Sequence, residues 1–166
     1  MDIKNKLNSC FKEGEKGERH KGLRQIAISP EIISGHIKKA IHNFNAMDIF
    51  KRDGYSDWSA SASFYALYHL LLALIAKKGF ESRNQNCTFA LIEDMINKKE
   101  ISLTKEELNE IFDKDVTEDL QHSNKILDIR ENMQYSTKTS IENDAFNKLK
   151  ERTVVLIEKF RREIEK

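Results

Sequence analysis

Proline, glycine and cysteine are scarce in this chain. Its 166 residues include one proline, six glycines and two cysteines. So few turn-forming residues do not suit a protein built from β-hairpins, whereas the abundant Lys, Glu and Leu favour helix. Cys10 and Cys87 lie far apart and lack CxxC spacing, so we expect both to stay reduced in a cytoplasmic protein.

An excess of charge of one sign is also absent. Lys and Arg number 28 and Asp and Glu number 27, so any site for a polyanion must be local. The apolar stretch 64–76 is shorter than the about 20 residues that span a bilayer, and it contains His69. The N-terminus has no apolar signal-peptide core. We therefore expect a cytoplasmic protein without a membrane segment.

Apolar residues recur at three- and four-residue spacing along most of the chain, which predicts helices. One helix is expected to begin after Ser29 as its N-cap and to end near Gly54. The next is expected to begin with Ser56 or Asp57 as its cap and to end at Gly79. This second helix is apolar on nearly every side, which predicts that it is the buried central helix.

The second half of the chain also reads as helix. A short helix is predicted after a capping box that opens at Thr104, and two longer amphipathic helices are predicted from Thr117 and from Ser140. No strand, repeat or linker is evident, so the fold class is all-α, a bundle with four main helices. Residues 1–28 are interpreted as a polar arm or short helix, and 29–166 as a single helical domain.

Common catalytic motifs are missing. The chain has no GxGxxG, GxxxxGK[ST] or HExxH, and its five histidines are scattered. Glu118 and His122 would share a helix face, but a di-iron bundle needs such ligands from several helices. We predict no metal site and no cofactor. His69 is interpreted as a neutral core histidine, with a position facing a cleft as the alternative.

Three strings carry a resemblance to a known family. The segments "FYALYH" and "AKKGF", and later "DIRENMQYS", resemble the signature of the HEPN superfamily, in particular its small stand-alone archaeal and bacterial members. The resemblance covers roughly residues 30–160. It implies an antiparallel bundle of four to five helices that is usually a homodimer, often encoded beside a minimal nucleotidyltransferase. Many members are metal-independent ribonucleases, often toxins of toxin–antitoxin modules, and others bind nucleotides or RNA without catalysis.

The chain departs from the ribonuclease motif that the resemblance implies. That motif is Arg, a polar residue, three to five further residues, then His. Arg130 and Glu131 fit its start, but Tyr135 stands where the shortest version has His, and no histidine follows. Gln85 also replaces a histidine that close relatives often have. A tyrosine with a pKa of about 10 is a poor general base at neutral pH.

We therefore expect no catalytic residues and a non-catalytic protein that binds a nucleotide, RNA or a nucleotidyltransferase partner, as part of a toxin–antitoxin-like module. The alternative is a metal-independent ribonuclease toxin with an altered active site. The resemblance points to a binding site at Arg130, Glu131 and Tyr135, with His69, Arg83 and Gln85 as residues of a cleft.

Overall fold

The computed structural model describes residues 2–111 and 126–166, which form seven helices and two short strands. The elements are α1 (Ile3–Gly14), β1 (Leu23–Gln25), α2 (Pro30–Arg52), α3 (Asp57–Lys77), β2 (Phe80–Ser82), α4 (Gln85–Asn97), α5 (Lys105–Asn109), α6 (Ile126–Tyr135) and α7 (Asn143–Glu165). The prediction of a helical bundle is confirmed. The expectation that the chain has no strand is wrong, because β1 pairs with β2 in an antiparallel ladder.

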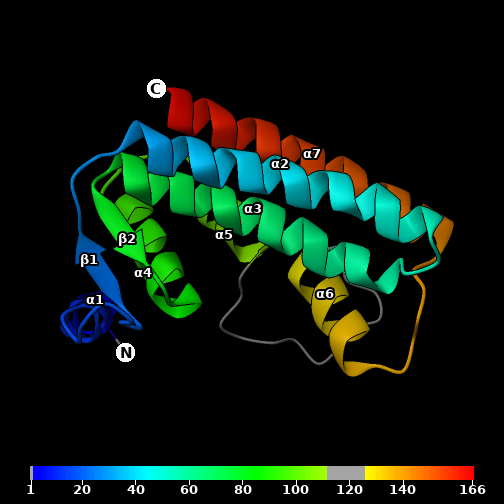
Figure 1. Ribbon diagram of the computed structural model, residues 1–166, viewed down its shortest axis with the longest axis horizontal. Coiled ribbons are helices and arrows are strands. Elements are labelled where there is room, and N and C mark those ends of the chain that lie inside the picture. The colour runs from blue at the N-terminus through cyan, green and yellow to red at the C-terminus, as the bar shows by residue number, and fades with distance from the viewer. Residues whose placement is uncertain (1, 112–125) are drawn as a thin grey trace.

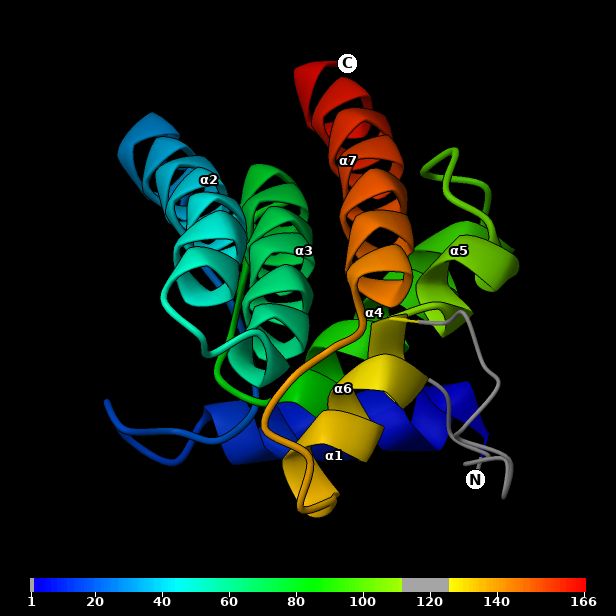
Figure 2. The ribbon, with the colours of Figure 1, turned by 90° about the vertical axis from the view of Figure 1, so that its right-hand side faces the viewer.

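Helix α3 is the centre of the bundle. Helices α2, α4, α6 and α7 all pack against it. In Figure 1, α2, α3 and α7 lie along the long axis, and α2 and α3 run in opposite directions. Figure 2 shows α3 between α2 and α7, with α4, α6 and α1 beneath them. Around α3, therefore, α2 and α7 lie on opposite sides, and α4 and α6 lie on a third side.

Burial explains the composition of α3. Fifteen of its 21 residues are buried, as expected for a helix that is apolar on nearly every side. At 21 residues α3 is longer than its apolar stretch, and by length and composition alone it could cross a membrane. However, 83% of its apolar window is buried inside the fold. A core helix passes the same test, so this feature is weak support for a membrane span.

Small serines on α3 join it to its neighbours. Ser59 Oγ donates to the carbonyl of Met47 on α2 at 2.9 Å, and Ser63 Oγ lies 2.7 Å from Thr153 Oγ1 on α7. Ser56 occupies the N-cap position without a capping hydrogen bond. Its Oγ instead accepts a hydrogen bond from the backbone N–H of Ile141 at 2.9 Å, which fixes the start of the C-terminal segment to α3.

Some of the predicted helix starts are confirmed and one is wrong. Ser29 caps α2 through the N–H of Ile32, and Thr104 forms the expected capping box with Glu107. The last helix begins at Asn143 rather than after Ser140, so that prediction is wrong. Apart from Glu163, its buried residues recur at three- and four-residue spacing, as an amphipathic helix requires: Phe146, Leu149, Thr153, Leu156, Phe160 and Ile164. The predicted start at Thr117 and the pair Glu118 and His122 lie outside the described residues.

The N-terminal segment folds back on the bundle. Helix α1 packs against α4, and Cys10 of α1 is bonded to Cys87 of α4, with their Cα atoms 5.7 Å apart. The expectation of two reduced thiols is therefore wrong for this structure. The physical reason is the path of the chain: β1 pairs beside β2, and this brings α1 over the first turn of α4 although 77 residues separate the two cysteines.

Candidate functional site

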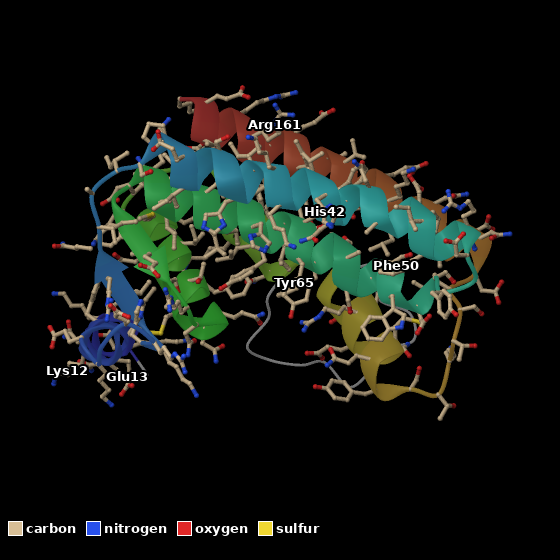
Figure 3. The ribbon with its side chains drawn as sticks, in the orientation of Figure 1. Lys12, Glu13, His42, Phe50, Tyr65 and Arg161 are labelled. Atoms are coloured by element: carbon tan, nitrogen blue, oxygen red, sulfur yellow. A yellow bond between two sulfur atoms is a disulfide. The ribbon has the colours of Figure 1, made fainter. Side chains whose placement is uncertain are left out.

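One side of α3 carries aromatic side chains that are not fully buried in the core. Trp58, Tyr65 and His69 follow one another at intervals of seven and four residues, so they share one face of the helix. Trp58 is 58% exposed and Tyr65 is 40% exposed, and His69 is partly buried. Figure 3 shows Tyr65 on the side of α3 away from α7. We call Trp58, Tyr65 and His69, together with Arg130 of α6, the aromatic face.

Arg130 reaches this face because α6 packs against α3. The central carbon of its guanidinium lies 4.1 Å from the ring centre of Phe64 and 5.9 Å from that of Tyr65. Such stacking holds the planar guanidinium in one orientation. Its Nε is buried and has no hydrogen-bond partner, and no described residue forms an ion pair with Arg130. A buried cationic donor of this kind favours an anionic ligand.

His69 contacts a second histidine. Its Nδ1 lies 3.1 Å from Nδ1 of His36 on α2. Burial, followed by the nearby His36 and Lys39, lowers the pKa of His69 to about 4. Burial also lowers the pKa of His36, against a smaller opposing effect of Glu81. Both imidazoles are therefore neutral at neutral pH, as expected for His69, and His36 is the hydrogen-bond partner of His69.

The two tyrosines beside His69 differ in their surroundings. Tyr68 is buried, and its hydroxyl lies 3.1 Å from Thr88 Oγ1 on α4. Burial raises the pKa of this hydroxyl. Tyr68 is therefore a core residue whose hydroxyl has a hydrogen-bond partner, whereas Tyr65 is exposed at the surface.

The other predicted residues on α6 lie apart from Arg130. Tyr135 is the last residue of α6. Its ring is 80% exposed, and no contact joins it to Arg130 within one chain. Glu131 is partly buried on the next position of α6. The structure therefore places Arg130 against α3 and leaves Tyr135 in solvent.

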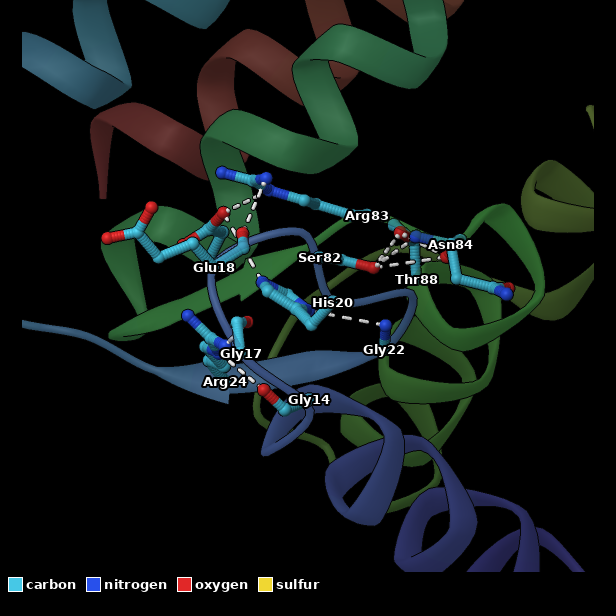
Figure 4. A network of polar contacts seen from close by, with 11 residues as sticks. Gly14, Gly17, Glu18, His20, Gly22, Arg24, Ser82, Arg83, Asn84 and Thr88 are labelled. Atoms are coloured by element: carbon cyan, nitrogen blue, oxygen red, sulfur yellow. Dashed lines mark hydrogen bonds and ion pairs between the residues drawn. The ribbon is translucent and has the colours of Figure 1, made fainter.

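Arg83 and Gln85 lie at the end of the molecule where β2 meets α4. Gln85 is the first residue of α4. Arg83 pairs with Glu81 at 2.8 Å and donates to the carbonyl of Glu18 at 2.8 Å, as Figure 4 shows. Arg83 thus binds the N-terminal loop to β2. It is not part of the aromatic face.

Further polar contacts hold the N-terminal loop in Figure 4. His20 is buried, its Nδ1 accepts the N–H of Gly22 at 3.3 Å, and its Nε2 lies 3.5 Å from a carboxylate oxygen of Glu81. Arg24 donates to the carbonyls of Gly14 and Gly17. These contacts are structural, and they account for the fixed position of the loop between α1 and β1.

Sequence reasoning missed part of the aromatic face. The spacing of Trp58, Tyr65 and His69 was available as a signal, but the uniform apolarity of α3 predicted burial instead. The pairing of His36 with His69 had no local signal, because it depends on how α2 docks on α3. Among the described residues, no group of three or more His, Cys, Asp or Glu side chains is arranged to hold a metal ion.

The fold and the site define a small helical-bundle protein with an arginine stacked on its central helix. A model of the HEPN domain family matches residues 33–163, and the chain therefore belongs to the HEPN family. The resemblance seen in the sequence is confirmed. Helix α1 and strand β1 lie before the matched residues. No curated protein matches the sequence.

Proposed function

We propose that this HEPN protein binds a nucleotide or a short single-stranded RNA at the aromatic face and does not cleave it. The observation that carries the proposal is the guanidinium of Arg130, which is stacked on Phe64 and has a buried Nε without a partner. Guanidinium groups recognise phosphate oxygens through parallel hydrogen bonds. A bound phosphate would pair with the charge of this guanidinium.

Exposed aromatic rings supply the second half of the argument. Trp58 and Tyr65 lie on the same face of α3, with 58% and 40% of their surfaces exposed. Bases stack on such rings with little sequence preference, while a cationic groove follows the phosphates. The net charge of +1 gives no strong general attraction for nucleic acid, so the affinity must come from this local arrangement.

The residues of α6 support binding rather than cleavage. No histidine follows Arg130 in the sequence, and Tyr135 stands where the shortest version of the family's ribonuclease motif has its histidine. The side chain of Tyr135 is mostly in solvent. Removing a 2′-hydroxyl proton needs a base within hydrogen-bond reach of it.

We also propose a homodimer in the cytoplasm that works with a minimal nucleotidyltransferase in a toxin–antitoxin-like module. Family membership supports this assignment. Dimerisation would also give Tyr135 a role, because its exposed ring at the end of α6 is free to contact the site of a second copy.

Fluorescence anisotropy with a labelled single-stranded RNA and with a labelled adenine nucleotide tests the proposal. We expect Arg130→Ala to weaken binding by about 1–3 kcal/mol, the scale of a charge-assisted hydrogen bond, with little change in thermal stability. The matched control is Arg161→Ala, because Arg161 is an exposed arginine on α7 on the opposite side of the molecule (Figure 3). The affinity of the Arg161→Ala variant for RNA and nucleotide should stay within about twofold of that of the wild type.

The same RNA, incubated with the protein in EDTA, tests for cleavage. We expect intact RNA. Cleavage by the wild type that is lost in Arg130→Ala would establish the ribonuclease alternative, and Tyr135 would then need testing as the base. Unfolding of Arg130→Ala, together with no binding by the wild type, would make Arg130 a purely structural residue.

A further inference from the structure

The two imidazoles of His36 and His69 meet head-on. Their Nδ1 atoms are 3.1 Å apart and their ring centres are 5.4 Å apart. The difference, 5.4 − 3.1 = 2.3 Å, is about twice the radius of an imidazole ring, so both Nδ1 atoms lie near the line between the ring centres. This is the geometry of two nitrogens that share one hydrogen.

Sharing one hydrogen fixes what the pair presents to its surroundings. In the neutral pair one Nδ1–H donates to the other Nδ1, so one outer Nε2 is an acceptor and the other carries a hydrogen. One added proton turns both outer nitrogens into donors and gives the pair a positive charge. A second proton would place two N–H groups and two charges face to face, so the pair accepts one proton only.

The position of the pair connects it with the aromatic face. His69 lies one helical turn from Tyr65, which is the ring beside the Arg130 guanidinium. The charged groups that act on the pair are Lys39 of α2, which is near His69, and Glu81 of β2, which is near His36. Glu81 already forms an ion pair with Arg83, so it offsets a positive charge on the two histidines only weakly.

We propose that His36 and His69, together with Lys39, form a second phosphate subsite beside Arg130, and that the pair takes up one proton when a phosphate binds there. The proposal rests on the proposed function, since Arg130 holds the first phosphate. It specifies a ligand with at least two phosphates, such as an oligonucleotide or a nucleoside diphosphate. An anion favours the state with two donors and a positive charge, which burial otherwise disfavours.

The first test measures RNA binding at two pH values. The labelled oligonucleotide carries no terminal phosphate, because its backbone phosphodiesters alone do not titrate between pH 5.5 and 7.5. Uptake of one proton tightens binding by at most tenfold per pH unit. We therefore expect the affinity for RNA to be about 5- to 50-fold higher at pH 5.5 than at pH 7.5. His69→Asn and His36→Asn should reduce this rise to less than about twofold, since asparagine cannot take up the proton.

The matched control is His42→Asn, because His42 is an exposed histidine on the same helix as His36 (Figure 3). It should keep the pH dependence of the wild type. Circular dichroism establishes that each variant is folded. If His36→Asn and His69→Asn bind RNA with the wild-type pH dependence, the subsite is refuted while the role of Arg130 stands.

A second test does not depend on RNA binding. The ring resonances of His36, His69 and His42 are followed by nuclear magnetic resonance at pH 6 during titration with inorganic pyrophosphate. Shifts of His36 and His69 toward the protonated form, without a shift of His42, support the subsite even where RNA fails to bind and the proposed function is wrong. The absence of any shift of the pair refutes the subsite.

Discussion

Reduction of the bond between Cys10 and Cys87 should destabilise this protein strongly. The bond joins α1 to α4 and closes a loop with a sequence separation of 77 residues. The other links between the N-terminal segment and the rest of the fold include the short pairing of β1 with β2, the packing of α1 on α4, and the contacts of Glu18 and His20 with Arg83 and Glu81. Reduction leaves these contacts in place but frees the unfolded chain from the cross-link.

The chain-entropy relation for a loop of this length gives about 4.5 kcal/mol at 25 °C. This is an upper value, because residual structure in the reduced unfolded chain lowers it. For a chain of 150–250 residues, each kcal/mol shifts the melting temperature by about 2–4 °C. A loss of half of the upper value on reduction would therefore lower the melting temperature by about 4–9 °C. The reduced form is the one that a cytoplasmic location would favour.

Differential scanning fluorimetry with and without a phosphine reductant measures the effect. We expect the oxidised wild type to melt at the higher temperature. The double variant Cys10→Ser with Cys87→Ser should melt near the reduced wild type and should not respond to the reductant. Equal melting temperatures for the oxidised and reduced wild type would refute the reasoning, because α1 would then lie outside the cooperative unit. Thiol titration establishes the starting oxidation state.

Three further predictions concern stability and assembly. Ser56→Ala removes the acceptor of the buried Ile141 N–H and should lower the free energy of unfolding by about 1–3 kcal/mol in urea denaturation, whereas Ser56→Thr should retain most of it. The pKa of His69 is about 4 in the folded state and near 6.5 when unfolded, so its contribution to stability is complete above pH 6.5 and is lost as the pH falls toward 4. Urea denaturation across this range should show a weaker pH dependence for His69→Asn than for the wild type. Light scattering at micromolar concentration should report twice the chain mass of 19.4 kDa, and a monomer at all concentrations would remove the proposed contact of Tyr135 with a second copy.

Local patterns were sufficient for much of the fold. Ser29 before Pro30, and the capping box at Thr104, are signals that act within one helical turn, and both helices begin there. The burial of α3 followed from its uniform apolarity. The pairing of β1 with β2 and the bond of Cys10 to Cys87 could not be predicted, because they depend on the return path of a long segment rather than on any local preference.

The candidate site was harder to predict for a related reason. Hydropathy shows that Trp58 and Tyr65 are apolar, but not that their neighbours leave 58% and 40% of their surfaces exposed. Arg130 was identified through its family motif, whereas its stacking on Phe64 depends on the docking of α6 against α3. Tyr135 was grouped with Arg130 through the same family motif, and the structure leaves its side chain in solvent.

The histidines that do lie near Arg130 also argue for binding rather than cleavage. A general base is most effective when its pKa is near the working pH, and the pKa of His69 is about 4. At neutral pH the ring of His69 is unprotonated, but it is a weak base, and its Nδ1 is already engaged by His36. Burial lowers the pKa of both imidazoles and so makes them poor bases for removing a proton. In the subsite that we propose, a phosphate bound next to Arg130 would offset the cost that burial imposes on protonation of these imidazoles.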